Sequence, residues 1–219
     1  MGRLVGKVAI ITGAAKGLGE ADARMFAGEG ATVILTDMDA DNGNRVADEI
    51  GGAAEFHVQD VRDEQGWEDL IADVVSRHGK LDILVNNAGV VEPGTIETQT
   101  AEEYRLVMAV SADGAFFGCK YAVPAMKASG GGSIVNMCSI ASIVGEPIVV
   151  AYAMAKGAIE SLTRSVAVHC AHNQYNIRCN SVHPAGILTP MVEGIGAKLE
   201  GRNDLRPASE GPAPSALGE

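Results

Sequence analysis

The sequence has few aromatic residues and no cluster of basic ones. Only 4% of its 219 residues are Phe, Trp or Tyr, and its 17 Lys and Arg are outnumbered by 28 Asp and Glu, which gives a formal net charge of −11. Proteins that bind nucleic acid usually carry a basic patch that neutralises phosphates. We therefore expect no nucleic-acid partner.

Cysteines are also few, and their spacing follows no motif. Cys119, Cys138, Cys170 and Cys179 form no CxxC pair and no Cys/His pattern typical of zinc ligands. This usage fits reduced thiols in a reducing compartment, packed as small apolar side chains. We expect no metal site.

Long hydrophobic runs are missing as well. No apolar run approaches the roughly 20 residues that span a bilayer, and the opening segment MGRLVGKVAI lacks the apolar core of a secretory signal. We expect a cytoplasmic protein without a membrane partner. The length and the 47% hydrophobic content fit one compact domain over residues 1–219.

Short β-branched runs alternate with longer amphipathic segments along the chain. Strands are expected at residues 7–12, 32–36, 54–58, 82–86, 133–137 and 177–182. Helices are expected at residues 17–29, 40–50, 64–78, 101–128 and 151–172. Nearly continuous apolar strands separated by helices predict a parallel sheet covered on both faces, which is a doubly wound, Rossmann-like α/β fold.

A glycine-rich turn joins the first predicted strand to the first predicted helix. Gly13, Gly17 and Gly19 allow a tight turn, so that a pyrophosphate can approach backbone N–H groups at the start of the helix. The spacing G-x-x-x-G-x-G departs from the G-x-G-x-x-G fingerprint but meets the same physical need. Such a turn predicts a dinucleotide site, although it can also simply connect a strand to a helix.

Asp37 ends the second predicted strand, about twenty residues after this turn. A carboxylate there can accept hydrogen bonds from the adenine-ribose hydroxyls and would repel a 2′-phosphate, which favours NAD over NADP. The alternative is that Asp37 caps the following helix. Lys16 argues for NADP, because a cation beside the turn attracts the extra phosphate. We give Asp37 more weight than Lys16 and expect NAD, because recognition of the ribose hydroxyls needs a carboxylate at the strand end, whereas a lysine can point to solvent.

Tyr152 and Lys156 are four residues apart in a predicted helix and so share one face. Lowering a phenol pKa from about 10 to about 7 requires roughly 4 kcal/mol, and an ammonium about 4 Å away at an effective dielectric near 20 supplies that much. Tyr152 could then act as a general acid/base for an alcohol, with Ser139 donating a hydrogen bond to the substrate oxygen. The alternative is a tyrosine packed on a lysine stem.

Over residues 5 to about 191 the sequence resembles the short-chain dehydrogenase/reductase (SDR) family. The resemblance rests on TGAAKGLG, NNAG at 86–89, Ser139, YAMAK at 152–156 and NSVHPAGILTPM at 180–191. It implies a nicotinamide dinucleotide cofactor, with Tyr152 as acid/base and Lys156 also binding the nicotinamide ribose. It further implies cofactor contacts from the glycine turn, Lys16, Leu18, Asp37, Met38, Asp60, Val61, Asn87, Ala88, Gly89, Pro184, Gly186, Ile187 and Thr189.

Two features depart from the family pattern. Ser111 stands where the family usually has an asparagine in a proton relay, which predicts slower turnover because a hydroxyl holds the relay water less well than an amide. The proline- and glycine-rich residues 187–219 are expected to form a loop-rich cover over the substrate site, cut short before a final family helix and strand, with a loss of stability.

The stretch between Ser139 and Tyr152 is mostly aliphatic, which favours an apolar substrate over a sugar phosphate. The likeness is greatest to bacterial hydroxysteroid and cyclic-alcohol dehydrogenases, so we expect a secondary alcohol on a ring to be oxidised to a ketone. A homo-oligomer, dimer or tetramer, is implied through the helices at 101–128 and 151–172. The alternative is a catalytically weak dinucleotide-binding protein that senses cofactor or scaffolds an oligomer.

Overall fold

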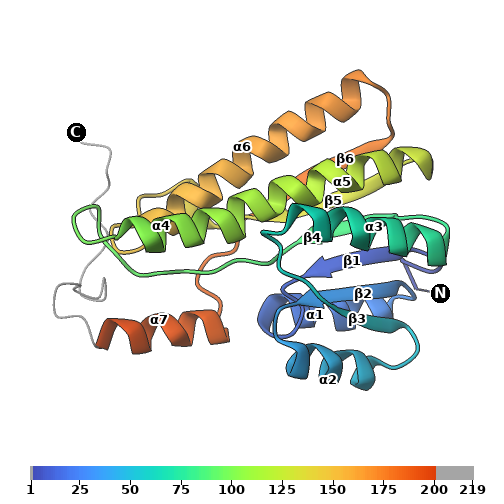
Figure 1. The fold of residues 1–219 in the computed structure, drawn as a ribbon. Helices are drawn as coiled ribbons and strands as arrows, with labels where there is room; N and C mark the ends of the chain where they lie inside the picture. Colours follow the sequence, from blue (N-terminus) through green and yellow to red (C-terminus); the bar gives the residue numbers. More distant parts are fainter. Residues whose placement is uncertain (1, 201–219) are drawn as a thin grey trace.

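The computed structural model describes residues 2–200, which contain a six-stranded parallel sheet (Figure 1). The strands are β1 Val8–Thr12, β2 Thr32–Asp37, β3 Ala54–Val58, β4 Ile83–Asn86, β5 Gly132–Met137 and β6 Ile177–Val182. They lie in the order β3-β2-β1-β4-β5-β6, and every pair is parallel. This arrangement confirms the doubly wound, Rossmann-like fold.

Helices follow the strands in turn, mostly at the predicted residues. They are α1 Gly17–Gly28, α2 Ala40–Ile50, α3 Glu64–His78, α4 Ala101–Met108, α5 Gly114–Ala128, α6 Val150–His172 and α7 Pro190–Glu200. A π-helical turn, η1 Ala109–Asp113, joins α4 to α5, and a 3₁₀ turn, η2 Ile140–Ser142, follows β5. The segment predicted as one helix at 101–128 is therefore two helices joined by a wider turn.

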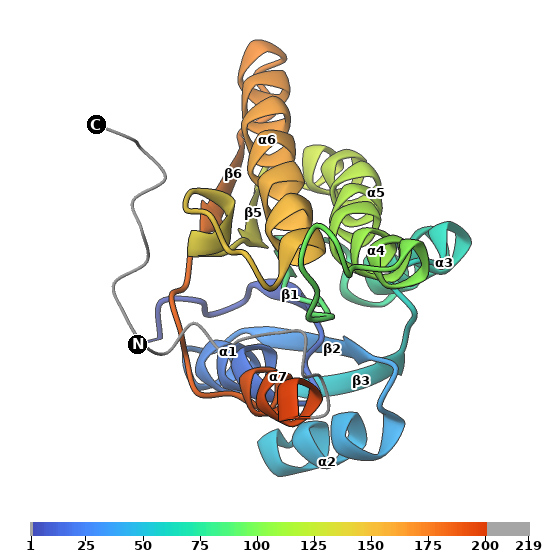
Figure 2. The same ribbon diagram turned by 90° about the vertical axis from the view of Figure 1, so that its left-hand side faces the viewer.

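Two hydrophobic clusters cover the two faces of the sheet. Because neighbouring strand residues point to opposite faces, Ile10 packs with α3, α5 and α6, while Ile11 packs with α1 and α2. Figures 1 and 2 show these two helical layers on either side of the strands. The central strands β1 and β4 are buried along their whole length, as a parallel sheet covered on both faces requires.

The strand order reverses direction between β1 and β4, which are neighbours in the sheet. The carboxyl ends of all six strands meet at one edge because the strands are parallel. Ligands of open α/β sheets bind in the crevice outside these ends, at such a switch point. A ligand site is therefore expected at the loops that follow β1 and β4.

The segment from residue 187 differs from the expectation of a loop-rich cover. Helix α7 begins at Pro190, whose fixed φ and missing N–H suit the first position of a helix. The N–H of Glu193 donates to the carbonyl of Thr189 at 3.1 Å and closes the first turn. The prediction treated this proline as a loop residue. The expected truncation and the loss of stability concern residues 201–219 and beyond, which lie outside the described residues.

The combined helix Ala101–Ala128 is long and apolar enough to cross a membrane by length and composition, with 39% of its most apolar window buried. The expectation that no apolar segment reaches this length was therefore too strict. Core helices of water-soluble proteins meet the same criterion. Here Cys119, Ala122 and Met126 of α5 pack against the sheet and α3, so the helix has a structural role in the core.

A buried chain of polar side chains ties β4, β5 and α6 together. Asn86 Nδ2 donates to Asn136 Oδ1 at 2.8 Å, and Asn136 Nδ2 donates to Thr163 Oγ1 at 2.9 Å. Gly118 of α5 passes directly over this chain: a Cβ on it would lie 2.3 Å from Asn86 Oδ1 and 2.9 Å from the Trp67 ring. Close packing, and not a positive φ value, is therefore the reason why this position needs glycine.

Alanine usually makes a helix more stable than glycine does. At position 118 this contact should make alanine destabilising instead. Gly118→Ala should lower the free energy of unfolding by about 1–3 kcal/mol, because the added methyl overpacks a buried site. The matched control is Gly157→Ala in α6, where a Cβ would meet nothing within 4 Å and helix propensity should add up to about 1 kcal/mol. Urea unfolding at 25 °C measures both; equal effects of the two changes would contradict this packing.

Candidate functional site

The glycine turn after β1 approaches the end of β4 closely. Gly13 and Gly17 have positive φ values of 64° and 62°, a conformation that favours glycine. A Cβ on Gly19 would lie 2.3 Å from the Gly13 carbonyl oxygen. The Asn87 carboxamide donates to the carbonyls of Thr12 and Gly13 at 2.8 and 3.1 Å. Asn87 thus stabilises the turn and leaves α1 with its N-terminus facing the crevice.

One cavity of about 650 Å³ runs along this edge of the sheet. Of the residues expected to bind cofactor, those that line it are Gly13, Lys16, Gly17, Leu18, Asp37, Met38, Asp60, Val61, Asn87, Ala88, Gly89 and Thr189. Within residues 2–200, six other residues expected to bind cofactor do not line it: Gly19, Tyr152, Lys156, Pro184, Gly186 and Ile187. Its length, its glycine cradle and the helix N-terminus at one side fit an extended dinucleotide.

Asp37, the last residue of β2, contributes a carboxylate to the lining of the cavity. Asp37 accepts hydrogen bonds from the backbone N–H groups of Ala15 at 3.1 Å and Asp39 at 3.0 Å. The cap of α2 is Asp39, which accepts from the N–H of Asn42, so Asp37 is not the helix cap. Its carboxylate is fixed beside the glycine turn by these two N–H groups.

Two further features of the cavity lining had no signal in the sequence. Asp60 forms an ion pair with Arg62, whose Nε lies 2.9 Å from the carboxylate, and this hydrogen bonding holds the pKa of Asp60 below its usual range. Gln59 is 7% exposed, and in the described part of the chain its carboxamide oxygen and nitrogen have no hydrogen-bond partner. Burial of a polar side chain at a strand end depends on the packing of α3, which local sequence does not encode.

Three predicted catalytic side chains come together outside the lining of this cavity. Lys156 is near it, since its Nζ lies 3.6 Å from a Cβ placed on Gly89, which lines the cavity. Ser139 follows β5, and its hydroxyl is near enough to the phenol of Tyr152 in α6 to lower the pKa of that phenol. Lys156, one turn further along α6, lies over the same phenol, with Nζ 5.4 Å from the centre of the ring. Lys156 is 3% exposed and donates to the carbonyl of Met137 at 2.7 Å. The shared helix face expected for Tyr152 and Lys156 is present.

The acidity of Tyr152 differs from the expectation. Burial raises the pKa of Tyr152, and the nearby Ser139 hydroxyl opposes that rise only in part. Lys156 is itself deeply buried, and loss of hydration lowers its pKa to about 8. The expectation that Lys156 alone lowers the Tyr152 pKa to about 7 is therefore wrong for the protein without a bound cofactor. That expectation considered the attraction between the two side chains but not the loss of hydration when both are buried.

Ser111 lies in the π-helical turn η1, close to the same site. A Cβ on Gly89 would lie 3.4 Å from Ser111 Oγ and 3.6 Å from Lys156 Nζ, so both groups converge on one point in the wall of the cavity. Ser111 is 1% exposed, and its hydroxyl has no hydrogen-bond partner among the described residues. π-turns frequently occur at functional sites. The sequence identified Ser111 but gave no sign of the π-turn that aims it.

Helix α7 forms one wall of the cavity that the sequence did not predict. Met191, Gly194, Ile195 and Lys198 line the cavity, together with Pro190 at the start of the helix. The ammonium of Lys198 lies 2.7 Å from both carboxylate oxygens of Glu92, on the loop after β4. A proline followed by helically spaced apolar residues was the available signal.

Comparisons with known proteins agree on the type of protein. A family model described as short chain dehydrogenase matches residues 7–200. The chain is 41% identical over 206 residues to an NADP-dependent (R)-specific alcohol dehydrogenase of Lentilactobacillus kefiri, covering 93% of this chain and 80% of that protein. It is 40% identical over 191 residues to a 3-beta-hydroxysteroid dehydrogenase of Comamonas testosteroni, covering 87% and 75%.

Two further similarities concern a ring alcohol and a solved structure. The chain is 41% identical over 204 residues to a trans-4-hydroxycyclohexanecarboxylate dehydrogenase of Sinomonas cyclohexanicum, covering 88% of this chain and 77% of that protein. It superimposes with a TM-score of 0.85 and 39% identity on a crystal structure of a short-chain dehydrogenase/reductase from Burkholderia xenovorans, covering 90% and 78% of the two chains.

Burial of Lys156 should be visible in the pH dependence of stability. Its pKa is about 8 in the folded protein against 10.5 for an ordinary lysine, so the unfolded chain binds the proton more tightly and stability should rise as pH increases through this window. Between pH 7.5 and 9.5 the native protein should gain about 2 kcal/mol relative to Lys156→Met. Urea unfolding at the two pH values measures this difference.

The control for this measurement is Lys127→Met, which removes an exposed lysine of α5. That variant should keep the pH dependence of the native protein. If Lys156→Met also keeps it, Lys156 is not buried as described.

Proposed function

The chain belongs to the short-chain dehydrogenase/reductase family, and from this membership we propose that it uses NAD to oxidise a secondary alcohol on an apolar ring to a ketone. As a member of the family it is an oxidoreductase that uses NAD or NADP. The observation that carries the finer proposal is the grouping of Ser139, Tyr152 and Lys156, with the Lys156 ammonium close to Gly89 in the wall of a cavity that is also lined by Asp37.

In this proposal, Ser139 and Tyr152 hold the reacting oxygen of the substrate together. The Ser139 hydroxyl lies near the phenol and influences its pKa, so an alcohol oxygen bound beside the two hydroxyls can interact with both. Ser139 donates to that oxygen, and Tyr152 takes its proton as the carbon is oxidised. The bound nicotinamide supplies the hydride acceptor. In the reverse direction Tyr152 returns the proton to the ketone oxygen.

Lys156 and Ser111 then provide the path for the proton after it reaches Tyr152. The Lys156 ammonium lies over the Tyr152 ring and stabilises a phenolate, while its pKa of about 8 leaves it able to exchange protons near neutral pH. Ser111 Oγ and Lys156 Nζ approach the same point beside Gly89. A water bound between them would satisfy the buried Ser111 hydroxyl and connect the site to solvent.

The Tyr152 pKa is raised by burial, so a further positive charge is needed for rapid proton transfer. An oxidised nicotinamide would supply such a charge if it bound near Tyr152, and a nearby positive charge favours a phenolate. Binding of the oxidised cofactor and activation of Tyr152 are therefore coupled in this proposal. This coupling prevents a reactive phenolate from forming before the cofactor is in place.

Asp37 is the support for NAD over NADP. Its carboxylate is held by two backbone N–H groups beside the glycine turn and would repel a 2′-phosphate. Lys16 and Arg62 also line the cavity, but Arg62 is ion-paired with Asp60 and Lys16 is exposed to solvent. The relative from Lentilactobacillus kefiri is NADP-dependent, so this choice is specific to the chain and needs its own test.

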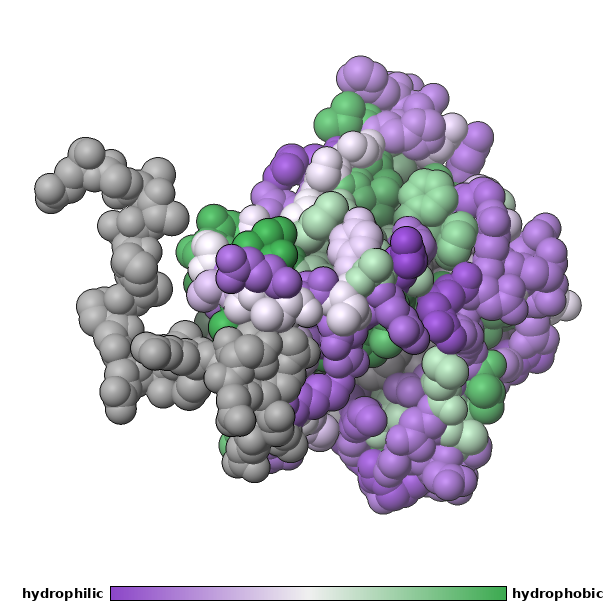
Figure 3. Space-filling view, turned by 60° about the vertical axis from the view of Figure 1, so that its left-hand side comes forward, coloured by the Kyte–Doolittle hydropathy of each residue, from purple (hydrophilic) through white to green (hydrophobic). Residues whose placement is uncertain are grey.

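An apolar ring fits the surface around the catalytic side chains. Large hydrophobic side chains remain exposed on η2, on the loop after it and near the start of α7, and they are Ile140, Ile143, Val144, Ile187, Leu188, Met191 and Val192. Figure 3 shows hydrophobic side chains gathered between hydrophilic ones on this face. Two of the relatives are dehydrogenases of a hydroxysteroid and of a cyclohexane carboxylate, both of which are ring alcohols.

A homo-oligomer is part of the same proposal. Phe116 of α5 and Val168 of α6 are 50% and 54% exposed on adjacent long helices. Pairing of these helices with those of a second copy would cover both side chains.

Removal of the phenol hydroxyl tests the catalytic assignment. Tyr152→Phe should lower kcat for a ring alcohol such as cyclohexanol by at least about 100-fold, since general acid–base catalysis contributes about 10²–10⁴, while the dissociation constant for NAD stays within about twofold. NADH absorbance and calorimetric titration measure the two quantities. The matched control is Tyr104→Phe, a tyrosine packed in the same small cluster, which should keep kcat.

The result that would reject the enzyme in favour of a cofactor-binding protein is tight NAD binding with no turnover of any ring alcohol by the native chain. Turnover that survives Tyr152→Phe would reject the proposed proton transfer.

Replacement of the carboxylate tests the choice of cofactor. Asp37→Ser should raise the ratio of kcat/KM for NADP to that for NAD by about 100-fold or more, because each pair of close charges in a partly shielded site contributes several kcal/mol. Asp41→Ser, which removes an exposed carboxylate from the first turn of α2, is the control and should leave the ratio unchanged. A native enzyme that already prefers NADP would contradict the role given to Asp37.

A further inference from the structure

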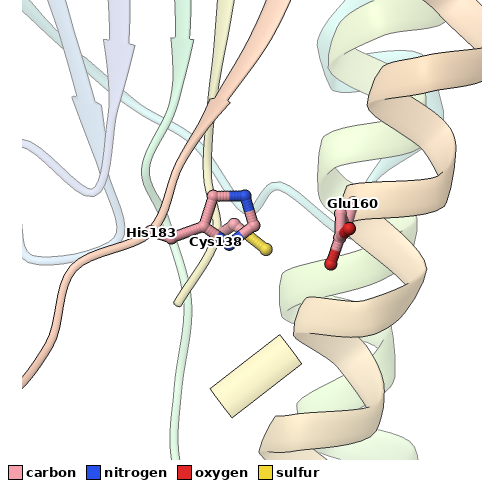
Figure 4. Close-up of side chains that lie close together, drawn as sticks. All are labelled: Cys138, Glu160 and His183. Atoms are coloured by element: carbon pink, nitrogen blue, oxygen red, sulfur yellow. The ribbon is translucent and has the colours of Figure 1, made fainter. Parts of the chain in front are cut away.

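Three possible metal ligands lie together outside the cofactor cavity. Cys138 follows β5, His183 follows β6, and Glu160 is in the middle of α6. One ligand atom from each side chain lies within 4.8 Å of the other two. Figure 4 shows the Cys138 sulfur beside the His183 ring, on the side that faces Glu160. The sequence gave no metal motif because the ligands come from three separate elements.

We propose that Cys138, Glu160 and His183 bind a zinc ion or a similar borderline divalent cation. Thiolate, imidazole and carboxylate together are typical zinc ligands, and a water can occupy the fourth tetrahedral position. Bond lengths of about 2.0–2.3 Å place tetrahedral ligand atoms about 3.3–3.8 Å apart. The three side chains therefore need to close by about 1 Å, which the partly exposed Glu160 can do by rotation.

The surroundings of Cys138 and His183 suit such an ion. The Cys138 thiol donates to the carbonyl of Lys156 at 3.0 Å and is buried, and metal binding would release its proton to solvent. The two ring nitrogens of His183 have separate partners: Nδ1 lies 3.1 Å from both the Ser139 carbonyl and the Ser142 hydroxyl, and Nε2 lies 2.9 Å from the Ser181 hydroxyl. Whichever nitrogen binds the metal, the other keeps a hydrogen bond that orients the ring.

One ion pair competes with the metal for Glu160. Arg164 Nη1 lies 2.5 Å from the Glu160 carboxylate, one helical turn away, and its side chain is 66% exposed. Solvent-exposed ion pairs of this kind contribute little to stability. A divalent cation held by a thiolate and an imidazole would therefore displace Arg164 into solvent.

The position of the site predicts a stabilising role. It joins the carboxyl ends of the edge strand β6 and its neighbour β5 to α6. The metal would lie next to the backbone of Ser139, because His183 contacts the Ser139 carbonyl and Cys138 is the residue before Ser139. A bound ion would hold the loop that carries Ser139 without taking part in hydride transfer.

Cobalt(II) is a spectroscopic probe for this site. Metal-free native protein titrated with Co²⁺ should develop a thiolate-to-cobalt charge-transfer band in the near ultraviolet and visible bands of tetrahedral intensity, both saturating at one equivalent, and Zn²⁺ should displace them. Cys138→Ala should abolish the charge-transfer band. The control is Cys170→Ala, a buried cysteine elsewhere in α6, which should keep it.

Glu160→Gln keeps the inference testable if loss of Cys138 prevents folding. Its side chain is partly exposed, and the change should raise the dissociation constant for Co²⁺ at least tenfold. One equivalent of Zn²⁺ should also raise the Tm of the native protein and not that of Glu160→Gln. Absence of the charge-transfer band in the native protein, its persistence in Cys138→Ala, or an unchanged dissociation constant in Glu160→Gln would overturn the proposal.

Discussion

The site depends on a lysine ammonium buried beneath a tyrosine ring. Lys156 has little access to water, and its ordinary charge is disfavoured there. The carbonyl of Met137 at the end of β5 is its hydrogen-bond acceptor, so the helix face that carries Tyr152 is fixed against the sheet edge. Tyr152, Ser139 and the nearby wall of the cofactor cavity take their relative positions from this contact.

The rest of the fold brings the cofactor groups to the same edge. Thr12 Oγ1 accepts from the N–H groups of Asn87 and Ala88 at 3.0 and 2.9 Å, which joins the end of β1 to the end of β4. The π-turn η1 directs Ser111 toward the same corner. In the proposed function an oxidised cofactor would bring a positive charge to Tyr152, which would make cofactor binding and proton transfer depend on each other.

Much of the fold could be predicted from the sequence because its signals are local. Apolar strands such as Val8–Thr12 and the glycine turn at Gly13 have a clear pattern, and the spacing of Tyr152 and Lys156 defines a helix face. The interruption at Ala109–Asp113 was not predicted, because π-turns are rare and the segment was compared only with the 3.6-residue period of an α-helix.

Other features of the site depend on contacts between distant segments. The burial of Gln59, the wall formed by α7 and the meeting of Cys138 with His183 each need two or three elements to pack together. The pKa of Tyr152 was misjudged for the same reason: the sequence shows the neighbouring charge but not the loss of water around both groups. The sequence could therefore identify which groups are neighbours, but it could not give the size of their effect on the Tyr152 pKa.

The most direct measurement is the ionisation of Tyr152 itself, followed by NMR of tyrosine labelled with ¹³C at Cζ and assigned with the phenylalanine variant. The account predicts an apparent pKa at or above the ordinary value of about 10 in the protein alone and a fall of at least about two units when NAD⁺ is bound. A pKa near 7 before NAD⁺ is added, or no change on its addition, would contradict the coupling of cofactor charge to proton transfer.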